Sequence, residues 1–136
     1  MEKIPRIGVG VLIKKGDKVL LGKRKNAHGT GSWCAPGGHL EFMETVDDCA
    51  RRETMEECGL TITNLQKSLY TEDFFREEDK HYLTMVVVAD WESGEPELRE
   101  PHKCEEWGWF SWDALPEPLF LPLKNHIEQG FTPFQT

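Results

Sequence analysis

The sequence lacks the long apolar run that a membrane-spanning helix requires. None of its apolar runs approaches the roughly 18 residues of such a helix. We also expect no signal peptide, and the sequence contains no internal repeat, low-complexity segment or interdomain linker. We therefore predict one globular domain over residues 1–136 and no membrane partner.

Paired cysteines and clustered basic residues are missing too. The four cysteines form no C-x-x-C pair and no zinc-like group with histidine, so a reducing cytoplasm is the simplest compartment. No basic run offsets the net charge of -8, which argues against non-specific binding of nucleic-acid polymers.

What the sequence does contain is a capped helix that ends in acidic residues. Thr45 is a typical N-cap, Asp48 follows it at the spacing of a capping box, and Gly59 is well placed to end the helix. At about 100° per residue, one stripe of this helix collects Val46, Cys49, Ala50, Glu53, Glu56, Glu57 and Leu60. Its apolar side therefore becomes a carboxylate cluster in the last turns, where the helix dipole disfavours anions.

The carboxylates of Glu53, Glu56 and Glu57 would repel one another, and burying them is costly unless a cation lies among them. Oxygen-only ligands favour a hard cation such as Mg²⁺, with Mn²⁺ as the alternative. The other interpretation of this cluster is a solvated acidic helix face without a ligand.

The spacing around the cluster resembles a known motif. All seven fixed letters of the pattern G-x5-E-x7-R-E-U-x-E-E-x-G-U, where U is bulky and apolar, are supplied by Gly38, Glu44, Arg52, Glu53, Glu56, Glu57 and Gly59. This pattern is the Nudix box, so the chain resembles the Nudix hydrolases. Thr54 departs from it at the first U. We expect Thr54 to change packing rather than chemistry, because it lies about 100° from Glu53 and off the carboxylate stripe.

The resemblance implies a role for each box residue. The implied metal ligands are Glu53, Glu56 and Glu57, helped by the backbone carbonyl of Gly37 or Gly38, while Arg52 and Glu44 would orient the cluster. The implied reaction is substitution at phosphorus, in which a carboxylate takes a proton from water.

Two kinds of carboxylate could act as that general base. One is Glu53 in the box, and the other is a later acid, Glu105 or Glu106. Adjacent residues of a strand face opposite sides, so only one of the later pair can face the site. We favour Glu105 of this pair, with a plain surface role as its alternative.

The pattern of apolar and turn residues predicts the order of elements. Strands are expected at 6–14, 19–24, 33–35, 62–70, 82–90 and 105–112, with a turn at 15–18 and loops at 71–80 and 92–103. A sharp turn at 36–38 and an extended piece at 39–42 lead to a helix at 45–58, and a closing helix is expected at 119–129. This order predicts an α/β/α sandwich around a mixed sheet, as in the Nudix fold.

Segments outside the box carry the resemblance further. GVGV at 8–11, LLGKRK at 20–25 and PGGHLEF at 36–42 resemble the MutT-type nucleotide triphosphate diphosphatases, which hydrolyse dGTP-like and thiopurine nucleotides. By that resemblance, Arg24 and His39 would contact phosphate and Thr84 the base. From the residues alone, 23–25 are either a solvated strand end or a phosphate contact through the Arg24 guanidinium, and His39 is a turn residue.

The base is expected across the sheet from the box helix. Candidate contacts are Trp33, Ala35, Thr84, Leu121 and Leu123. Core packing is the alternative for Trp33 and the leucines, and the tail at 121–123 departs from the glycine-containing backbone of that subfamily. Thr84 is a hydroxyl in an otherwise apolar strand, so it can donate to or accept from a base edge.

The expected function is Mg²⁺-dependent cleavage of a purine, dGTP-like nucleoside triphosphate to a monophosphate and pyrophosphate. A nucleoside diphosphate linked to a sugar or to a second nucleotide is the alternative substrate. A nucleotide-binding Nudix module without catalysis is the alternative class. The related enzymes also suggest a homodimer.

Overall fold

The structure is a computed structural model that describes residues 3–26 and 28–134. The described residues form one seven-stranded mixed sheet. Its strands are β1 (Arg6–Lys15), β2 (Lys18–Arg24), β3 (Trp33–Cys34), β4 (Gly37–His39), β5 (Thr61–Phe75), β6 (Lys80–Ser93) and β7 (Cys104–Ser111). The helices are α1 (Val46–Cys58), the short 3₁₀ helix η1 (Trp112–Ala114) and α2 (Leu121–Glu128).

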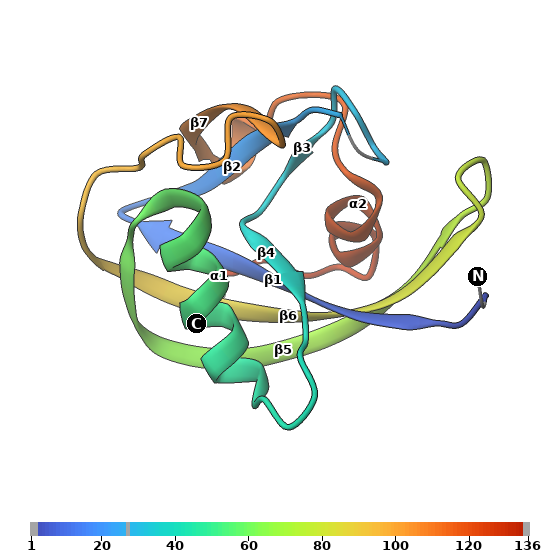
Figure 1. The fold of residues 1–136 in the computed structure, drawn as a ribbon. Helices are drawn as coiled ribbons and strands as arrows, with labels where there is room; N and C mark the ends of the chain where they lie inside the picture. The colour runs from blue at the N-terminus through green and yellow to red at the C-terminus, as the bar shows by residue number, and fades with distance from the viewer. Residues whose placement is uncertain (1–2, 27, 135–136) are drawn as a thin grey trace.

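The strand order is β3-β2-β1-β6-β5, with β4 paired to β1 and β7 paired to β2. β1 and β6 run parallel over a long register, from Arg6 opposite Tyr82 to Lys14 opposite Asp90, and the other pairs are antiparallel. Figure 1 shows β1 and β4 lying between the two helices.

Each face of β1 packs into a different core. Val11 joins Cys49 and Ala50 of α1 on one face, whereas Leu12 joins Leu123 of α2 on the other. Successive side chains of a strand point to opposite faces, so an apolar strand such as β1 is buried on both sides. The predicted α/β/α sandwich around a mixed sheet is confirmed.

The caps of α1 are those that the sequence predicts. The Thr45 hydroxyl accepts a hydrogen bond from the Asp48 backbone N–H at 3.1 Å. Gly59 adopts a left-handed conformation with φ 72°, and its N–H donates to the Met55 carbonyl at the other end of the last turn. Glycine suits this position because it has no Cβ to clash.

The buried face of α1 differs from the predicted stripe. Thr54, expected off the stripe, is fully buried with Cys49 and Ala50, whereas the Glu56 side chain is 52% exposed. The interior of the helix therefore follows the i, i+4 row through residues 50, 54 and 58, and Glu56 lies at its edge.

Two predicted boundaries were wrong. The segment expected to be a sharp turn includes β4, in which Gly37 and Gly38 pair with Gly10 and Val9 of β1. The charged loop expected at 71–80 begins instead with the last five residues of β5, which pair with β6 as far as Phe75. Along this segment Thr71, Asp73 and Phe75 are buried and alternate with the exposed residues Glu72 and Phe74.

Within the described residues, no helix is long and apolar enough to cross a membrane.

Candidate active site

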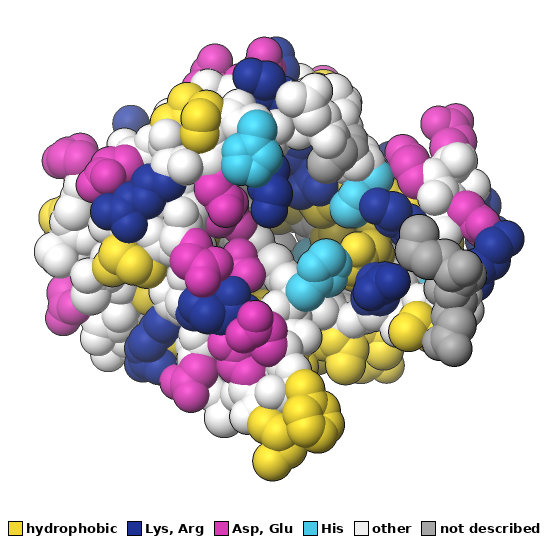
Figure 2. Space-filling model, in the orientation of Figure 1, with side chains coloured by type: hydrophobic (Ala, Val, Ile, Leu, Met, Phe, Trp, Pro, Cys, Tyr) yellow, Lys and Arg dark blue, Asp and Glu magenta, His cyan; other side chains and the backbone are white. Residues whose placement is uncertain are grey.

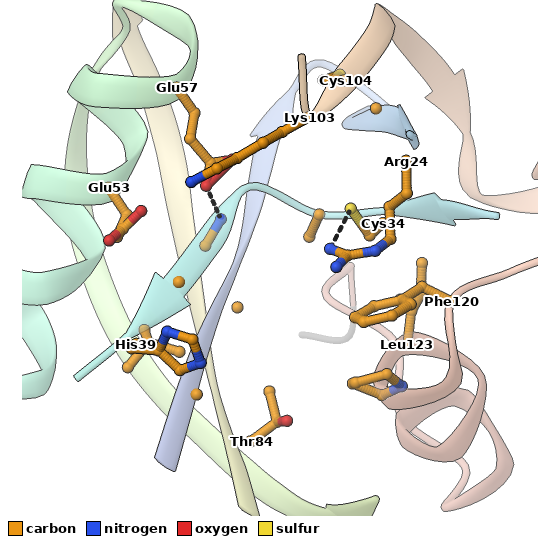
Figure 3. Close-up of a pocket in the computed structure, with 18 of the residues that line it drawn as sticks. Arg24, Cys34, His39, Glu53, Glu57, Thr84, Lys103, Cys104, Phe120 and Leu123 are labelled. Atoms are coloured by element: carbon orange, nitrogen blue, oxygen red, sulfur yellow. Dashed lines mark hydrogen bonds between the residues drawn. The ribbon is translucent and has the colours of Figure 1, made fainter. Parts of the chain in front are cut away.

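A cavity of about 730 Å³ opens between α1 and α2. Figure 2 shows it as a hollow in this face of the molecule, with acidic side chains on the α1 side and histidine and basic side chains around the rest of its rim. Figure 3 shows Glu53 and Glu57 at one end and Arg24, Phe120 and Thr84 toward the other. The cavity is therefore acidic at one end and basic and aromatic at the other.

Arg52 organises the acidic end. Its guanidinium forms two hydrogen bonds with the Glu44 carboxylate, at 2.7 and 3.0 Å, and a third with Glu53 at 2.8 Å. It also reaches Glu56 at 3.3 Å and the His39 carbonyl at 3.2 Å. The hydrogen bonds from Arg52 lower the pKa of Glu44 to about 2, so this carboxylate is charged at neutral pH.

Glu53 and Glu57 lie one helical turn apart and share a poorly solvated environment. Burial raises the pKa of Glu53, and burial together with the Glu53 charge raises the pKa of Glu57 well above its usual range. The Gly37 backbone N–H donates to Glu57 at 3.3 Å, which offsets part of this effect. Arg52 pairs with Glu53, whereas the ion pairs of the described residues include none with Glu57.

The glycines of β4 let its backbone approach both neighbours. A Cβ on Gly37 would collide with the Val9 carbonyl oxygen of β1, and a Cβ on Gly38 would collide with the Glu53 carboxyl group. The backbone contact excludes a side chain at Gly37, and a side chain at Gly38 would displace the Glu53 carboxylate. The backbone of β4 lies directly against the carboxylates of α1 as a result.

Aromatic rings and Arg24 form the other end. The Arg24 guanidinium lies 4.0 Å from the Phe120 ring centroid, and its Nε donates to the His28 carbonyl at 2.8 Å. Cation–π contact and hydrogen bonding hold the guanidinium in place while it keeps its charge. Its remaining N–H groups face the cavity region near Cys34 (Figure 3).

Three rings stack along the cavity wall. Tyr82 lies between His28 and His39, with centroid distances of 5.6 and 5.5 Å, and its hydroxyl is 2.8 Å from His39 Nε2. Burial, followed by the nearby charges of Arg24 and Lys80, lowers the pKa of His28 to about 4. The pKa of His39 is lowered for the same kinds of reason. Both rings are therefore neutral at pH 7.

A match to a family model decides what this arrangement is. Residues 4–130 match the NUDIX domain, which covers nearly the whole chain and includes both ends of the cavity. The chain belongs to the Nudix hydrolases.

Its relatives include proteins named for different substrates. An oxidized purine nucleoside triphosphate hydrolase of Danio rerio is 34% identical, with 92% of this chain and 84% of that protein aligned. An ADP-ribose pyrophosphatase of Methanocaldococcus jannaschii is 33% identical over 85% of this chain and 68% of that protein. Among solved structures, a MutT NUDIX hydrolase from Burkholderia pseudomallei is 34% identical, with a TM-score of 0.87 over 93% of this chain and 98% of that one.

Nudix hydrolases generally use divalent metal ions, and part of this site fits one. The Glu53 and Glu57 carboxylates repel each other in a half-buried setting, which a cation between them would relieve. No set of three or more acidic, histidine or cysteine side chains in residues 3–26 and 28–134 is arranged to hold a metal ion. The Glu56 carboxylate accepts a hydrogen bond from Arg52. Its side chain would therefore have to rotate before Glu56 could act as a metal ligand.

The cavity of this Nudix hydrolase gathers many, but not all, of the predicted site residues. Those that line it are Arg24, Ala35, Gly37, Gly38, His39, Arg52, Glu53, Glu57, Thr84 and Leu123. Trp33 packs in the core against Phe110, with ring centroids 5.1 Å apart, as its alternative interpretation proposed. Leu121 does not line the cavity, and Pro122 beside it does.

Glu105 is likewise not among the lining residues. Its side chain is 47% exposed and lies 3.6 Å from the Lys23 ammonium on the surface. Glu100, from the loop before β7, lines the cavity instead, and its charge contributes to the raised pKa of Glu57. The geometry therefore favours Glu100 over Glu105 as the carboxylate outside the box.

Sequence reasoning missed the aromatic wall and this acid. The missed residues are His28, Phe75, Tyr82, Glu100 and Phe120. Burial alternates along Thr71, Asp73 and Phe75, but the letters TEDFF do not alternate apolar with polar, so this end of β5 carries no clear strand signal. Glu100 lies in a polar loop with no local signal.

Proposed function

We propose that this Nudix hydrolase cleaves nucleoside triphosphates, with dGTP-like purine nucleotides as the preferred class, to a nucleoside monophosphate and pyrophosphate in a Mg²⁺-dependent reaction. The observation that carries the proposal is the cavity of about 730 Å³ with a carboxylate pair at one end and an aromatic, hydroxyl-bearing wall at the other. A pocket of several hundred Å³ suits a ligand of nucleotide size. The relative named for oxidized purine nucleoside triphosphates supports the substrate class.

The acidic end would bind the reacting phosphates. Glu53 and Glu57 would hold the metal ion, with Glu56 joining after it leaves Arg52. When bound, the metal ion neutralises phosphate charge and lowers the pKa of bound water. Arg24 and His39 would contact the phosphates, since Arg24 keeps its charge and both side chains line the cavity.

In the reaction, the oxygen of a water molecule forms a new bond to phosphorus, and the bridging P–O bond between the α- and β-phosphorus atoms breaks. The water proton passes to a carboxylate, for which Glu53 and Glu100 are the two candidates in the cavity. Arg52 and Glu44 orient Glu53 through their hydrogen bonds.

The base would lie against Thr84, Ala35 and Leu123 at the opposite end. Thr84 is the polar contact among these three residues. If Thr84 binds purine, Thr84→Val should cost about 1–3 kcal/mol in kcat/KM for purine substrates through one lost hydrogen bond. An equal loss for pyrimidine and sugar nucleotides would instead assign Thr84 a packing role.

A second substrate class is a nucleoside diphosphate linked to a sugar or nucleotide. The observation in its favour is the similarity to an ADP-ribose pyrophosphatase. The third hypothesis is a non-catalytic nucleotide-binding module. The complete set of box glutamates argues against it.

A nucleotide panel separates these possibilities. Purified protein is incubated with dGTP, dATP, dCTP, ADP-ribose and a nucleotide sugar, with Mg²⁺, with Mn²⁺ or with a chelator, and products are separated by chromatography. We expect pyrophosphate and dGMP from dGTP, and only with a divalent ion. Cleavage of ADP-ribose with intact triphosphates would overturn the substrate class, and binding without any turnover would overturn catalysis.

We also propose a reducing cytoplasm as the compartment, because Cys34, Cys49, Cys58 and Cys104 are all free thiols. The homodimer stays a prediction.

A further inference from the structure

Asp73 is a buried carboxylate behind the cavity wall. It is 0% exposed, and the ion pairs among the described residues include none with Asp73. Its partners are neutral. The hydroxyls of Thr71 and Thr84 donate to one oxygen, at 3.0 and 2.5 Å, and the Asn125 amide donates to the other at 2.9 Å.

The strands place these groups together. Thr71 on β5 lies opposite Thr84 on β6, and Asp73 is two residues further along β5 on the same face. Asn125 comes from α2, which packs over this face. One carboxylate therefore connects β5, β6 and α2 directly behind the base end of the cavity.

This connection has a chemical consequence for Thr84. A hydroxyl has one proton to donate and two lone pairs to accept with, and the Thr84 hydroxyl donates to an Asp73 oxygen. Because the Thr84 proton is directed at Asp73, the hydroxyl oxygen has only lone pairs left for a ligand. Thr84 can then accept a hydrogen bond from the cavity but cannot donate one.

The cavity side of Thr84 is open to a ligand. Its nearest neighbour on β1 is Gly8, and a Cβ there would lie 3.7 Å from the Thr84 hydroxyl oxygen. Gly10 likewise leaves space beside the Thr84 methyl group. A longer side chain at position 8 would cover the hydroxyl, so the two glycines keep it accessible.

We propose that Asp73 is a specificity-determining positioning residue: it holds Thr84 as an acceptor, so the site selects bases that present an N–H group there. Guanine presents such groups as its ring N1–H and 2-amino group. An unsubstituted purine presents only ring-nitrogen acceptors on that edge, which would face the Thr84 lone pairs. This inference rests on the proposed function, because it takes Thr84 as the base contact.

Selectivity between two substrates measures this effect directly. The probes are dGTP and the deoxyriboside triphosphate of unsubstituted purine, which share phosphates, sugar and ring system. We expect the protein to favour dGTP in kcat/KM by about tenfold or more, since a missing donor leaves a buried acceptor unpaired. Equal kcat/KM for the two substrates would overturn the proposal.

Asp73→Leu removes the carboxylate with similar shape and frees the Thr84 proton to rotate toward the cavity. The preference for dGTP should then fall to within about threefold, because the hydroxyl can donate to a ring nitrogen as well as accept. Asn125→Ala is the matched control, since it removes the link to α2 but leaves the Asp73–Thr84 hydrogen bond. It should lower the melting temperature and preserve the preference.

The exchanged pair Asp73→Asn with Asn125→Asp gives a rescue test that does not depend on the leucine variant folding. The carboxylate at 125 would accept from the amide N–H₂ at 73, which turns the amide oxygen at 73 toward Thr84. The preference for dGTP should return. Loss of preference in Asn125→Ala, or its absence in the exchanged pair when melting is normal, would show that Asp73 only ties α2 to the sheet.

The failure of the proposed function would look different. If no triphosphate is hydrolysed, calorimetric binding of dGMP and the unsubstituted purine deoxyriboside monophosphate still reports the preference and its response to each variant. Turnover of dGTP without base preference would sustain the proposed function and reject the role of Asp73.

Discussion

The α1 end of the cavity and the α2 end differ in how far apart along the chain their residues lie. Glu44, Arg52, Glu53 and Glu57 occupy one short segment, and a helix alone brings three of them together. The other end takes Arg24, Tyr82, Thr84, Phe120 and Leu123 from β2, β6 and the region of α2. The carboxylate end is therefore encoded in one short segment, whereas the aromatic end, which we propose binds the base, is assembled from distant elements.

The two ends also respond to protons with opposite sign. Burial and mutual repulsion raise the pKa of Glu53 and Glu57, whereas burial and nearby cations lower the pKa of His28. Lowering the pH therefore reduces the charge repulsion between Glu53 and Glu57 at the α1 end. At the α2 end it places an unfavourable positive charge on His28. The predictions below separate the two ends, from the largest expected effect to the smallest.

Glu57→Gln should break the acidic end and leave the other end intact. Removing one metal-ligand charge is expected to cost several kcal/mol of transition-state stabilisation, or roughly 1,000-fold in kcat/KM, for every substrate. Steady-state kinetics with Mg²⁺ titration measures it. Glu128→Gln, in the exposed last turn of α2, is the matched control. Near-normal turnover in Glu57→Gln would reject the metal-site assignment.

Glu100→Gln should distinguish the carboxylate outside the box. If Glu100 is the general base, kcat should fall about 100-fold with little change in KM. Glu105→Gln, which removes only a surface ion pair with Lys23, should leave kcat within about twofold. A larger loss in Glu105→Gln than in Glu100→Gln would restore the sequence-based choice of Glu105.

Arg24→Ala tests whether Arg24 binds the phosphates rather than the base. Loss of a charge-assisted hydrogen bond should lower kcat/KM about tenfold, and equally for purine and pyrimidine triphosphates, because the phosphates are common to all. Lys18→Ala, at the exposed start of the same strand, is the control. A changed ranking between guanine and pyrimidine substrates would place Arg24 beside the base.

The pH dependence of stability in the absence of metal should reveal the raised pKa values of Glu53 and Glu57. The pKa values of Glu53 and Glu57 are raised above 4.5 in the folded state, so their contribution is complete below pH 4.5 and is lost as the pH rises through the raised values. Glu57→Gln should therefore melt a few degrees higher than the parent at pH 8 but not at pH 4. Equal melting shifts at both pH values would contradict this.

The contribution of His28, at the α2 end, to the pH dependence of stability should have the opposite sign and be smaller. The pKa of His28 is lowered from 6.5 to about 4, so its contribution is complete above pH 6.5 and is lost as the pH falls toward 4. His28→Asn keeps the backbone carbonyl that binds Arg24 and should lose less stability than the parent between pH 6.5 and 4. Thermal melting at three pH values measures the difference, and parallel curves for both proteins would contradict the assignment.

The sequence by itself determined the α1 end and most of the fold. Thr45 and Gly59 set the ends of the helix, the box spacing placed Arg52 among its carboxylates, and alternating apolar runs predicted the main strands. These features follow from interactions between near neighbours in the chain. Helix period and strand alternation are local rules, so a single sequence expresses them.

Only the tertiary structure decided the rest. It turned Thr54 inward and Glu56 to the edge, placed Glu100 at the cavity, and put Trp33 in the core. It also placed Asp73 in hydrogen-bonding contact with Thr84. In the sequence, Asp73 was a charged residue of a predicted loop, and nothing indicated this contact. These outcomes depend on which elements pack against one another. A side chain gains a contact partner only when another strand or helix packs opposite it.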